Sequence, residues 1–536
     1  MAGTGSSSAE AERKKITGRA GIVAAGTLFS RVLGLVRDQV LAAVFTRAAT
    51  DAFFVAFTIP NVLRQLLAEG AVQNAVLPVL AKTREQEGDE AARQLFRALR
   101  GLSLLILSVV TVVGVALAPQ LVELFAGGFH AHAGQYERTV TLTRWVFPYI
   151  FFMGTAALGV AALNVNQRFV ATSFAPALLN VAFVVCALAL PDLIGARGHD
   201  RTLALAAGVL LGGLLQVVAQ WPSLRAIGYL GLPSFDFALP GVRDALRRMG
   251  PVLLGLGVYY IDVVLARRFL SDLGVGAQSY FGWALRLCDF PQGIFVMALQ
   301  SATLPSLALL VARGDEQEVA ATFAYGMRLA LFVALAASVL FVVLAEPVVA
   351  LIFQRGHFDA ESTRETAKAL AAQGLGIWMV AAVRQLVGVY YALGDTRTPV
   401  VVAAVDLGVF VLLALSLKGS LGHVGISLAV SGASAAQMLL LWFGLSRRLP
   451  TTRAKEILGS ALRTLVATAP AAAAGFLVAR LLAPAPGASA LRVLWPGLGA
   501  VGAYGVVFLI AAWFVRSEEL RSLVDGLRRR GRAKGA

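Results

Sequence analysis

Arginine residues interrupt several long apolar segments of this sequence, and they are the residues best suited to chemistry. Arg31 and Arg37 lie in the first apolar segment, Arg64 in the second, Arg286 in the eighth and Arg384 in the tenth. An arginine at the centre of a membrane-spanning helix costs about 2.5 to 3.5 kcal/mol on insertion scales. Several such arginines in one chain therefore indicate a water-filled cavity or an anionic partner.

The chemistry of the guanidinium group narrows the choice of ligand. Its planar fork of donors matches phosphate and carboxylate oxygens, so several in one cavity fit a diphosphate better than a cationic drug. Arg31 and Arg37 are six residues apart, about 120° around an ideal helix, and can face one broad cavity. Gly26, Ser30 and Gly34, at four-residue steps, form a small-residue stripe on which a neighbouring helix can pack closely.

Structural explanations exist for some of these arginines. Arg37 could pair with the adjacent Asp38, Arg31 could extend its charged group to the membrane interface, and Arg384 could bond to backbone groups near a helix end. The arginines of the second and eighth segments are harder to explain in this way, because each lies among apolar neighbours in a different half of the chain.

Two carboxylates indicate a second site. Asp262 in the seventh apolar segment and Asp406 in the eleventh stand alone in apolar surroundings. They could bind a coupling sodium ion or proton, or pair with cavity arginines. No other metal site and no cofactor is expected, because the two cysteines and five histidines lack ligand-type spacing. Cys186 and Cys288 are predicted to be small buried hydrophobic residues.

The composition excludes a soluble enzyme. Of the 536 residues, 58% are hydrophobic and 15% are charged, and the mean hydropathy is +0.74, whereas soluble chains carry about 25% charged residues. No phosphate-binding loop and no serine hydrolase motif with a partnering histidine occurs, so enzymatic activity is not expected. The net charge of +16 lies mostly at segment ends, which disfavours nucleic acid as a partner.

The apolar segments predict an all-α polytopic membrane protein with about fourteen transmembrane helices, since a bilayer core needs about 20 apolar residues per helix. An even count puts both termini on one side. The basic tails at 1–19 and 516–536 identify that side as cytoplasmic. The first apolar run is too long for a signal peptide and is expected to be retained. The expected spans are 20–42, 51–80, 98–118, 139–163, 171–190, 203–224, 245–269, 277–311, 322–344, 366–392, 399–417, 423–446, 457–482 and 492–515.

An internal repeat divides the chain. Three anchors recur in order at nearly constant spacing: Leu77-Pro78 as Leu304-Pro305, 227 residues later, Pro119 as Pro347, 228 later, and Arg168 as Arg397, 229 later. They predict a duplicated six-helix unit whose copies share one orientation and enclose a cavity. The expected domains are an N-terminal lobe at 20–230, a C-terminal lobe at 240–447 and two additional helices at 457–515.

The chain resembles the MurJ (MviN) family of lipid II flippases, part of the multidrug/oligosaccharidyl-lipid/polysaccharide exporter superfamily, from about residue 20 to 515. The motifs nearest the N-terminus are the most specific, and the remainder follow at intervals. They are Ser30-Arg31-Val-Leu-Gly-Leu-Val-Arg37-Asp38, Thr50-Asp51 through Pro60-Asn61-Val-Leu-Arg64, Ala68-Glu69-Gly70-Ala71, Phe147-Pro148-Tyr149-Ile150, Phe174-Ala175-Pro176-Ala-Leu-Leu-Asn180, Met249-Gly250-Pro251, Arg286-Leu-Cys-Asp-Phe-Pro291 and Thr398-Pro399.

The resemblance implies a flippase of the bacterial inner membrane. It would move lipid II, the undecaprenyl-diphosphate-linked peptidoglycan precursor, from the inner to the outer leaflet by alternating access. The family's essential cavity arginines match Arg31, Arg37, Arg64 and Arg286, which would bind the diphosphate. The candidate supporting cavity residues are Asp38, Asp51, Glu69 and Arg384.

The resemblance also implies features outside that cavity. The last two helices would form a groove for the lipid tail, and Asp262 and Asp406 could correspond to a sodium site seen in some members. The membrane potential could help to drive transport, and proteins of cell-wall synthesis are candidate partners beside the lipid bilayer. The alternatives are a cation-coupled multidrug antiporter of the same superfamily, a flippase for another polyprenyl-diphosphate-linked oligosaccharide, or a scaffold that transports nothing.

Overall fold

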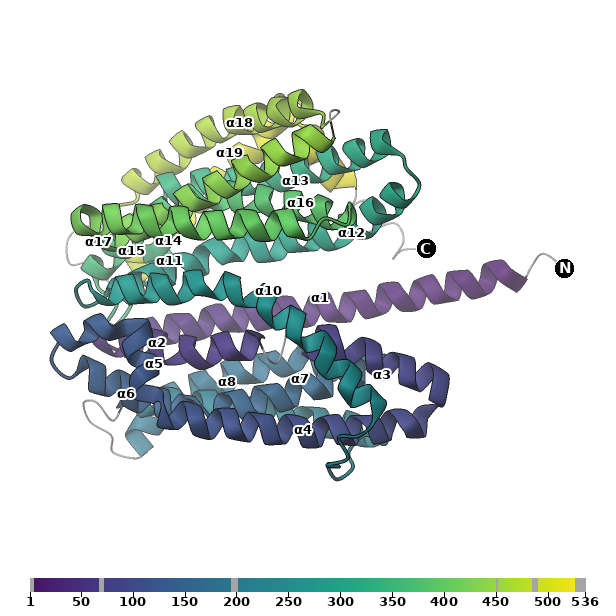
Figure 1. Ribbon diagram of the computed structural model, residues 1–536. Helices are drawn as coiled ribbons and strands as arrows, with labels where there is room; N and C mark the ends of the chain where they lie inside the picture. The colour runs from purple at the N-terminus through teal and green to yellow at the C-terminus, as the bar shows by residue number, and fades with distance from the viewer. Residues whose placement is uncertain (1–3, 67–71, 194–200, 450–451, 484–489, 526–536) are drawn as a thin grey trace. The chain divides into compact units, whose positions relative to one another are not determined.

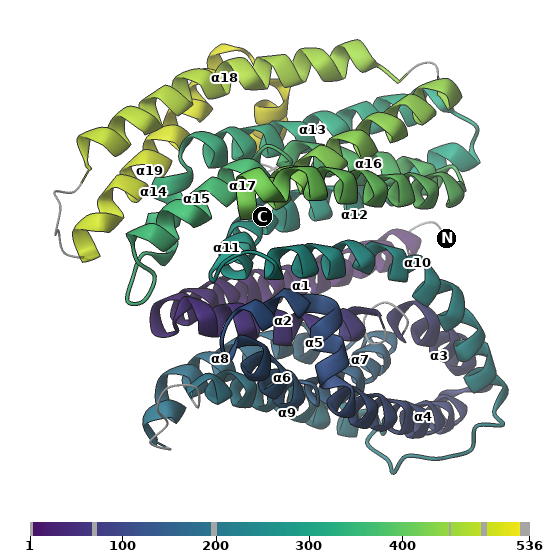
Figure 2. The same cartoon turned by 60° about the vertical axis from the view of Figure 1, so that its left-hand side comes forward.

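The computed structural model describes residues 4–66, 72–193, 201–449, 452–483 and 490–525. Within these residues every regular element is a helix and no strand occurs, so the predicted all-α class is confirmed. The chain divides into two compact units, Met1–Val275 and Gly276–Ala536. Figures 1 and 2 show that each unit is built from long helices packed side by side.

The first unit consists of helices of very different lengths. Its elements are α1 (Thr4–Val44), α2 (Arg47–Arg64), α3 (Gln73–Glu87), α4 (Asp89–Ala116), α5 (Ala118–Ala126), the 3-10 turn η2 (Gly127–Ala131), α6 (Gln135–Val146), α7 (Tyr149–Val165), α8 (Phe169–Leu193), α9 (Leu203–Ala226) and α10 (Pro240–Ser271).

The second unit follows a similar series and ends with two additional helices. Its elements are α11 (Ala277–Pro291), the π-helical turn η4 (Gln292–Val296), α12 (Met297–Ala312), α13 (Glu316–Val343), α14 (Ala345–Phe353), α15 (Ala360–Gly374), α16 (Ile377–Ala392), α17 (Arg397–Arg448), α18 (Ala454–Leu481) and α19 (Ala490–Phe514).

Helix lengths follow the repeat that the sequence predicts. Helices α4 and α13 both have 28 residues and begin at Asp89 and Glu316, 227 residues apart. Helices α5 and α14 both have 9 residues and begin at Ala118 and Ala345, again 227 apart. The duplication therefore preserved the lengths of successive helices as well as a few motifs.

Both repeats contain a π-helical turn at the same position. One begins at Gln65, directly after α2, and the other begins at Gln292, directly after α11 and 227 residues later. A π turn is a rare distortion that is frequent at functional sites. Arg64 immediately precedes the first π turn, and Arg286 lies six residues before the second.

Helix α10 packs with the first unit, although the repeat pairs it with α1. It contacts α3, α4, α5 and η2. The hydroxyl of Tyr260 donates to Gln65 Oε1 at 2.7 Å, and Arg267 Cζ lies 5.4 Å from the ring centroid of Phe54. The first compact unit therefore extends to Val275, whereas the sequence interpretation began the second lobe at residue 240.

Helix α17 folds back on itself at Gly422. This glycine has φ 57° and ψ −134°, a left-handed backbone that glycine adopts without steric cost. Arg448 Nη1, at the end of α17, lies 2.6 Å from Asp395 Oδ2, two residues before the helix begins. The reversal confirms the expected break between the spans 399–417 and 423–446.

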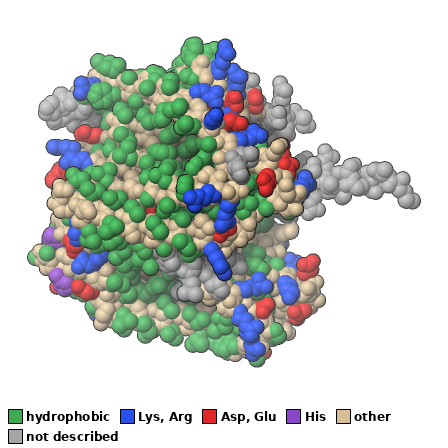
Figure 3. All heavy atoms as spheres, turned by 45° about the horizontal axis from the view of Figure 1, so that its top comes forward, with side chains coloured by type: hydrophobic (Ala, Val, Ile, Leu, Met, Phe, Trp, Pro, Cys, Tyr) green, Lys and Arg blue, Asp and Glu red, His purple; other side chains and the backbone are tan. Residues whose placement is uncertain are grey.

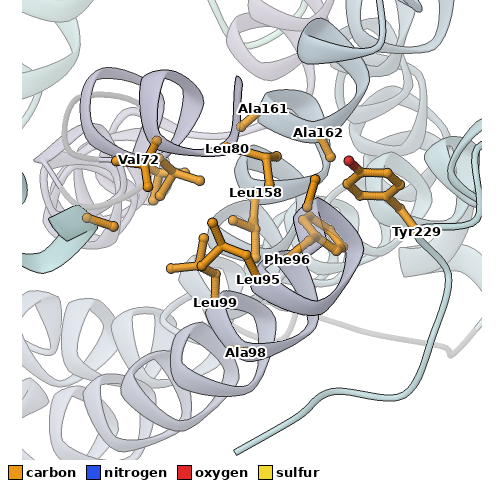
Figure 4. Packing of buried hydrophobic residues seen from close by; sticks show 14 of the residues in the cluster. Val72, Leu80, Leu95, Phe96, Ala98, Leu99, Leu158, Ala161, Ala162 and Tyr229 are labelled. Carbon is orange, nitrogen blue, oxygen red and sulfur yellow. The ribbon is translucent and has the colours of Figure 1, made fainter. Parts of the chain in front are cut away.

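Apolar side chains fill the spaces between helices and also cover much of the outer surface. Figure 4 shows one buried cluster, in which Leu80, Leu95 and Leu158 join α3, α4 and α7, and Tyr229 packs against Phe96. Hydrophobic side chains also spread widely over the face in Figure 3. This outer coat is typical of a helix bundle whose solvent is lipid.

Nine helices of the described residues are long and apolar enough to cross a bilayer, and α17 counts among them once although it holds two of the expected spans. The expected total of about fourteen stays a prediction.

Asp395 fastens the two ends of α17 and provides a pH-dependent test of that hairpin. The Thr398 hydroxyl and backbone N–H, followed by the Arg448 guanidinium, hold the pKa of Asp395 at about 2, below its ordinary 3.8. A lowered folded-state pKa means that Asp395 stabilises the fold above pH 3.8 and that this contribution is lost as the pH falls towards about 2.

We expect Asp395→Ala to lower the free energy of unfolding by about 1 kcal/mol at neutral pH, the usual cost of losing such a helix cap. The difference from the parent should shrink below about pH 4, as measured by thermal unfolding in detergent. Asp315→Ala, which removes the cap that accepts from Glu318 N in α13, controls for capping alone. A deficit in Asp395→Ala that stays constant down to about pH 2 would contradict the assignment.

Candidate functional site

The first arginine pair lies on a helix that packs closely against α8. A Cβ built on Gly26 of α1 would lie only 2.6 Å from the carbonyl oxygen of Ser173 in α8. One turn later the carbonyl oxygen of Ser30 accepts a hydrogen bond from Asn180 Nδ2 at 3.0 Å, and Gly34 faces the same amide. The predicted small-residue stripe is confirmed, and its partner is α8.

Arg37 is held by three groups on two helices. Its Nε and Nη2 donate to Asp38 Oδ1 at 3.0 and 2.7 Å, and its Nη1 donates to Asn180 Oδ1 at 3.2 Å. The guanidinium carbon lies 5.7 Å from the ring centroid of Phe183, a cation–π distance. The Arg37 and Asp38 side chains are 14% and 7% exposed. The suggested pairing of Arg37 with Asp38 is therefore present, within a larger network.

Arg31, on the same helix, is half-buried and differs from Arg37 in its contacts. Its side chain forms no hydrogen bond or ion pair with the residues that the structure describes. The six-residue spacing still separates the two side chains by about 120°. Arg31 thus keeps its donors available for an added anion, whereas Arg37 has two N–H groups left, one on each Nη atom.

Arg64 is the last residue of α2. Its Nε donates to Asn61 Oδ1 at 3.0 Å, one turn earlier on the same helix, and its side chain is half-buried. Asp51, near the start of α2, is 1% exposed. The remaining candidate of this region, Glu69, lies outside the described residues.

Arg286 belongs to the second unit, on α11, and its side chain is exposed. Cys288, two residues later, and Cys186 in α8 are both buried free thiols, as expected. Arg31, Arg37 and Arg64 belong to the first unit and Arg286 to the second. The geometry within each unit therefore describes only part of the predicted diphosphate-binding set.

Arg384 lies in the middle of α16. Its carbonyl oxygen accepts a hydrogen bond from Gln300 Nε2 of α12 at 3.1 Å, while its half-buried side chain forms no bond with any described residue. The suggestion that the Arg384 side chain satisfies backbone groups near a helix end is therefore wrong. Its donors remain available for a ligand.

The two candidate ion-binding carboxylates lie in different units, Asp262 on α10 and Asp406 on α17, and both are half-buried. Asp406 Oδ1 is shielded from solvent and accepts no hydrogen bond from the described part of the chain, and Asp406 forms no ion pair there. No cluster of three or more His, Cys, Asp or Glu side chains that could hold a metal occurs among the described residues. The oxygen chemistry of Asp406 suits sodium, but any further ligands would come from other groups.

Two buried polar residues escaped the sequence analysis. Asn180 was noted only within an apolar motif, although an amide in the middle of a span is itself a signal, because it must find partners there. Arg267 lies near the end of the expected span 245–269, yet it is 8% exposed and stacks on Phe54. Because Arg267 lies only one helical turn before the end of α10, nothing in the sequence distinguishes it from a cation at the membrane interface.

Taken together, the first unit presents cationic donors inside an apolar bundle. Arg37 is oriented by neighbours on two helices, and Arg31 is uncommitted. Such groups can bind phosphate oxygens strongly, because the low local dielectric strengthens charge-assisted hydrogen bonds. The arrangement is therefore suited to binding an anion.

Comparison with known proteins gives consistent results. The family model described as "Lipid II flippase MurJ" matches residues 41–493. The lipid II flippase MurJ of Burkholderia cenocepacia is 35% identical over 430 residues, which is 79% of this chain and 82% of that protein. The probable lipid II flippase MurJ of Bdellovibrio bacteriovorus is 34% identical over 461 residues, covering 85% and 87% respectively.

Solved structures share the fold. A lipid II flippase MurJ in an inward closed conformation aligns with a TM-score of 0.73 at 21% identity, over 92% of this chain and 98% of its own. An inward-facing multidrug transporter of the MATE family aligns with a TM-score of 0.64 at 14% identity, over 79% and 96%. At these identities the likeness concerns the fold alone.

The close approach of α1 and α8 can be tested at its tightest point. Gly26→Ala would place a methyl group against the Ser173 carbonyl, so the helices must separate, at a cost of about 1 to 3 kcal/mol. We expect a lower thermal midpoint and reduced function. Gly21→Ala on the same helix meets nothing within 4 Å and serves as the control. Equal midpoints for the two variants, in purified protein, would show that this contact is not tight.

Proposed function

The chain belongs to the lipid II flippase MurJ family, and from that premise we propose how it handles its substrate. It is a multi-pass membrane protein that moves lipid II. We propose that Arg31, Arg37, Arg64 and Arg286 bind the diphosphate of lipid II while the lipid crosses the bacterial inner membrane by alternating access. The long isoprenoid tail stays in the bilayer.

The observation that carries the proposal is the state of the arginines in α1. Arg37 is fixed by Asp38 and Asn180 and retains two N–H groups, and Arg31 donates to no described residue. A diphosphate at neutral pH offers several charged acceptor oxygens, and guanidinium groups bind such oxygens in pairs. Transport of a permanently anionic headgroup explains why these charges are retained despite their insertion cost.

The multidrug antiporter reading is less well supported. The MATE transporters share the fold at 14% identity, whereas relatives named lipid II flippase reach 33% to 35% identity over about four fifths of the chain. A cavity for cationic drugs would also hold carboxylates and few arginines, whereas five arginines lie within the apolar segments of this chain.

We further propose that Asp406, together with Asp262, takes part in coupling to sodium or protons, with the membrane potential assisting transport. Asp406 has a solvent-shielded oxygen with no hydrogen bond among the described residues, which is costly for a carboxylate unless a cation or proton occupies it. Sodium prefers such oxygen ligands.

The two additional helices form the proposed lipid-tail groove. Both pack on other helices of the second unit. Helix α18 contacts α13. Tyr504 of α19 donates to the Ala336 carbonyl at 2.7 Å, and Arg328 of α13 donates to Glu518 Oε2 and Glu519 Oε1, which follow α19, at 2.5 and 2.8 Å. A groove built on α18 and α19 would therefore move with that unit. We place both termini in the cytoplasm, where proteins of cell-wall synthesis could associate.

The arginine assignment is tested by rescue of bacteria whose own lipid II flippase is depleted. Arg31→Ala, Arg37→Ala, Arg64→Ala and Arg286→Ala, at matched membrane levels, should each fail to restore growth and outer-leaflet lipid II. Arg64→Lys should restore little, because an ammonium cannot form the bidentate contact. Arg447→Ala, an exposed arginine stacked on Phe443 at 4.2 Å, is the control.

Full rescue by the Arg31, Arg64 and Arg286 variants would rule out the proposed diphosphate contacts. Failure of the parent chain itself, with normal membrane insertion, would favour another polyprenyl-diphosphate-linked oligosaccharide.

Ion coupling at Asp406 predicts a sodium-specific effect on stability. Sodium that binds only the folded protein raises its unfolding midpoint, so the parent should be stabilised by sodium chloride relative to potassium chloride. Asp406→Asn should lose this difference, and Asp236→Asn, in an exposed loop, should keep it. An identical sodium effect in Asp406→Asn would exclude this residue as a ligand.

A further inference from the structure

A single buried amide connects the arginine network to a second helix. Asn180 lies near the middle of α8 and is 6% exposed. Its side chain has one acceptor and one double donor, and both ends are occupied. In an apolar bundle an amide without partners would be strongly unfavourable, so its position is determined by the groups that it bonds.

Only one orientation of the Asn180 amide allows both of its hydrogen bonds. Asn180 Oδ1 faces Arg37 Nη1 at 3.2 Å, and Asn180 Nδ2 faces the Ser30 carbonyl oxygen at 3.0 Å. A guanidinium can only donate and a carbonyl can only accept. If the amide oxygen and nitrogen were exchanged, the amide N–H would face the Arg37 N–H, and the amide oxygen would face the Ser30 carbonyl oxygen. The amide can therefore bond Arg37 only through its oxygen.

Asp38 and Asn180 restrain Arg37 in different ways. Asp38 is adjacent to Arg37 on α1, so it moves with that helix. Asn180 is 143 residues away in sequence and lies on α8, so it sets the guanidinium in register with a second helix. Gly34 faces this amide, since a Cβ there would lie 3.8 Å from Asn180 Nδ2, an ordinary van der Waals distance.

We propose that Asn180 is a positioning residue for lipid II transport: it holds the Arg37 guanidinium so that its remaining N–H groups meet the diphosphate. This inference rests on the proposed role of Arg37 in diphosphate binding. Asn180 acts through Arg37 and does not itself touch the lipid, so its contribution depends on the presence of that arginine.

A double-mutant cycle tests this dependence. Binding of lipid II to purified protein in detergent micelles is measured for the parent, Asn180→Ala, Arg37→Ala and the double variant. Loss of a hydrogen bond to a charged group corresponds to about a tenfold weakening, so Asn180→Ala should bind about tenfold more weakly than the parent. In the Arg37→Ala background the same change should weaken binding by less than about twofold.

Two further variants separate positioning from a packing role. Asn180→Asp keeps an acceptor towards Arg37 but turns an oxygen towards the Ser30 carbonyl oxygen, so its unfolding midpoint should fall. Its binding of lipid II should nevertheless stay stronger than that of Asn180→Ala, because Arg37 keeps its hydrogen bond. Gln216→Ala removes another buried amide, which contacts Met153 Sδ at 3.4 Å, and should bind as the parent does. The unfolding midpoint of each variant is measured in parallel.

The possible results are distinct. Weakening by Asn180→Ala that persists undiminished without Arg37, or Asn180→Asp as weak as Asn180→Ala, would place the role in the α1–α8 contact and overturn the inference. Parent-like binding by Asn180→Ala, with weak binding by Arg37→Ala, would also overturn it while leaving the proposed function intact. Parent-like binding by Arg37→Ala would instead refute the role of Arg37, and the inference with it.

Discussion

A guanidinium buried among apolar helices needs hydrogen-bond partners from the protein or from a ligand, because water cannot supply its hydrogen bonds there. Much of the first unit follows from this constraint. Arg37 bonds to Asp38 and Asn180, and Asn180 in turn bonds to the backbone of α1. On the same face of α1, a Cβ at Gly26 would lie only 2.6 Å from the Ser173 carbonyl oxygen of α8. The helix α8 that packs tightly on α1 is thus also the helix that supplies Asn180 to the Arg37 guanidinium.

The same constraint separates two kinds of arginine. Arg328 is 14% exposed and binds two carboxylates that follow α19, and Glu519 is itself 3% exposed and accepts from Ser460. Burial raises the pKa of Glu519, but the hydrogen bonds from Ser460, Ser517 and Arg328 outweigh it and keep the pKa below its ordinary value. This cluster is closed and fastens helices together. Arg31 and Arg384 have no such partner among the described residues, so they do not join helices in this way.

Much of this organisation could be predicted from the sequence, because hydropathy, small-residue spacing and motif recurrence are local signals. The helical class, the repeat, the Gly26 stripe and the Arg37–Asp38 pair all arise within one segment or from comparing two. The bond from Asn180 to Arg37 spans 143 residues, and the burial of Arg267 against Phe54 depends on how α10 packs. Tertiary contacts of this kind leave no trace in the periodicity of either segment, so the structure was needed to find them.

The π turns that begin at Gln65 and Gln292 bear on the history of the chain. A complete π turn amounts to one extra residue in a helix, which rotates everything beyond it by about 100°. Two independent insertions would both have to occur at the same position of the repeat. A single insertion in a half-length ancestral gene, copied when that gene duplicated and fused, accounts for both, so this irregularity is older than the protein's present length.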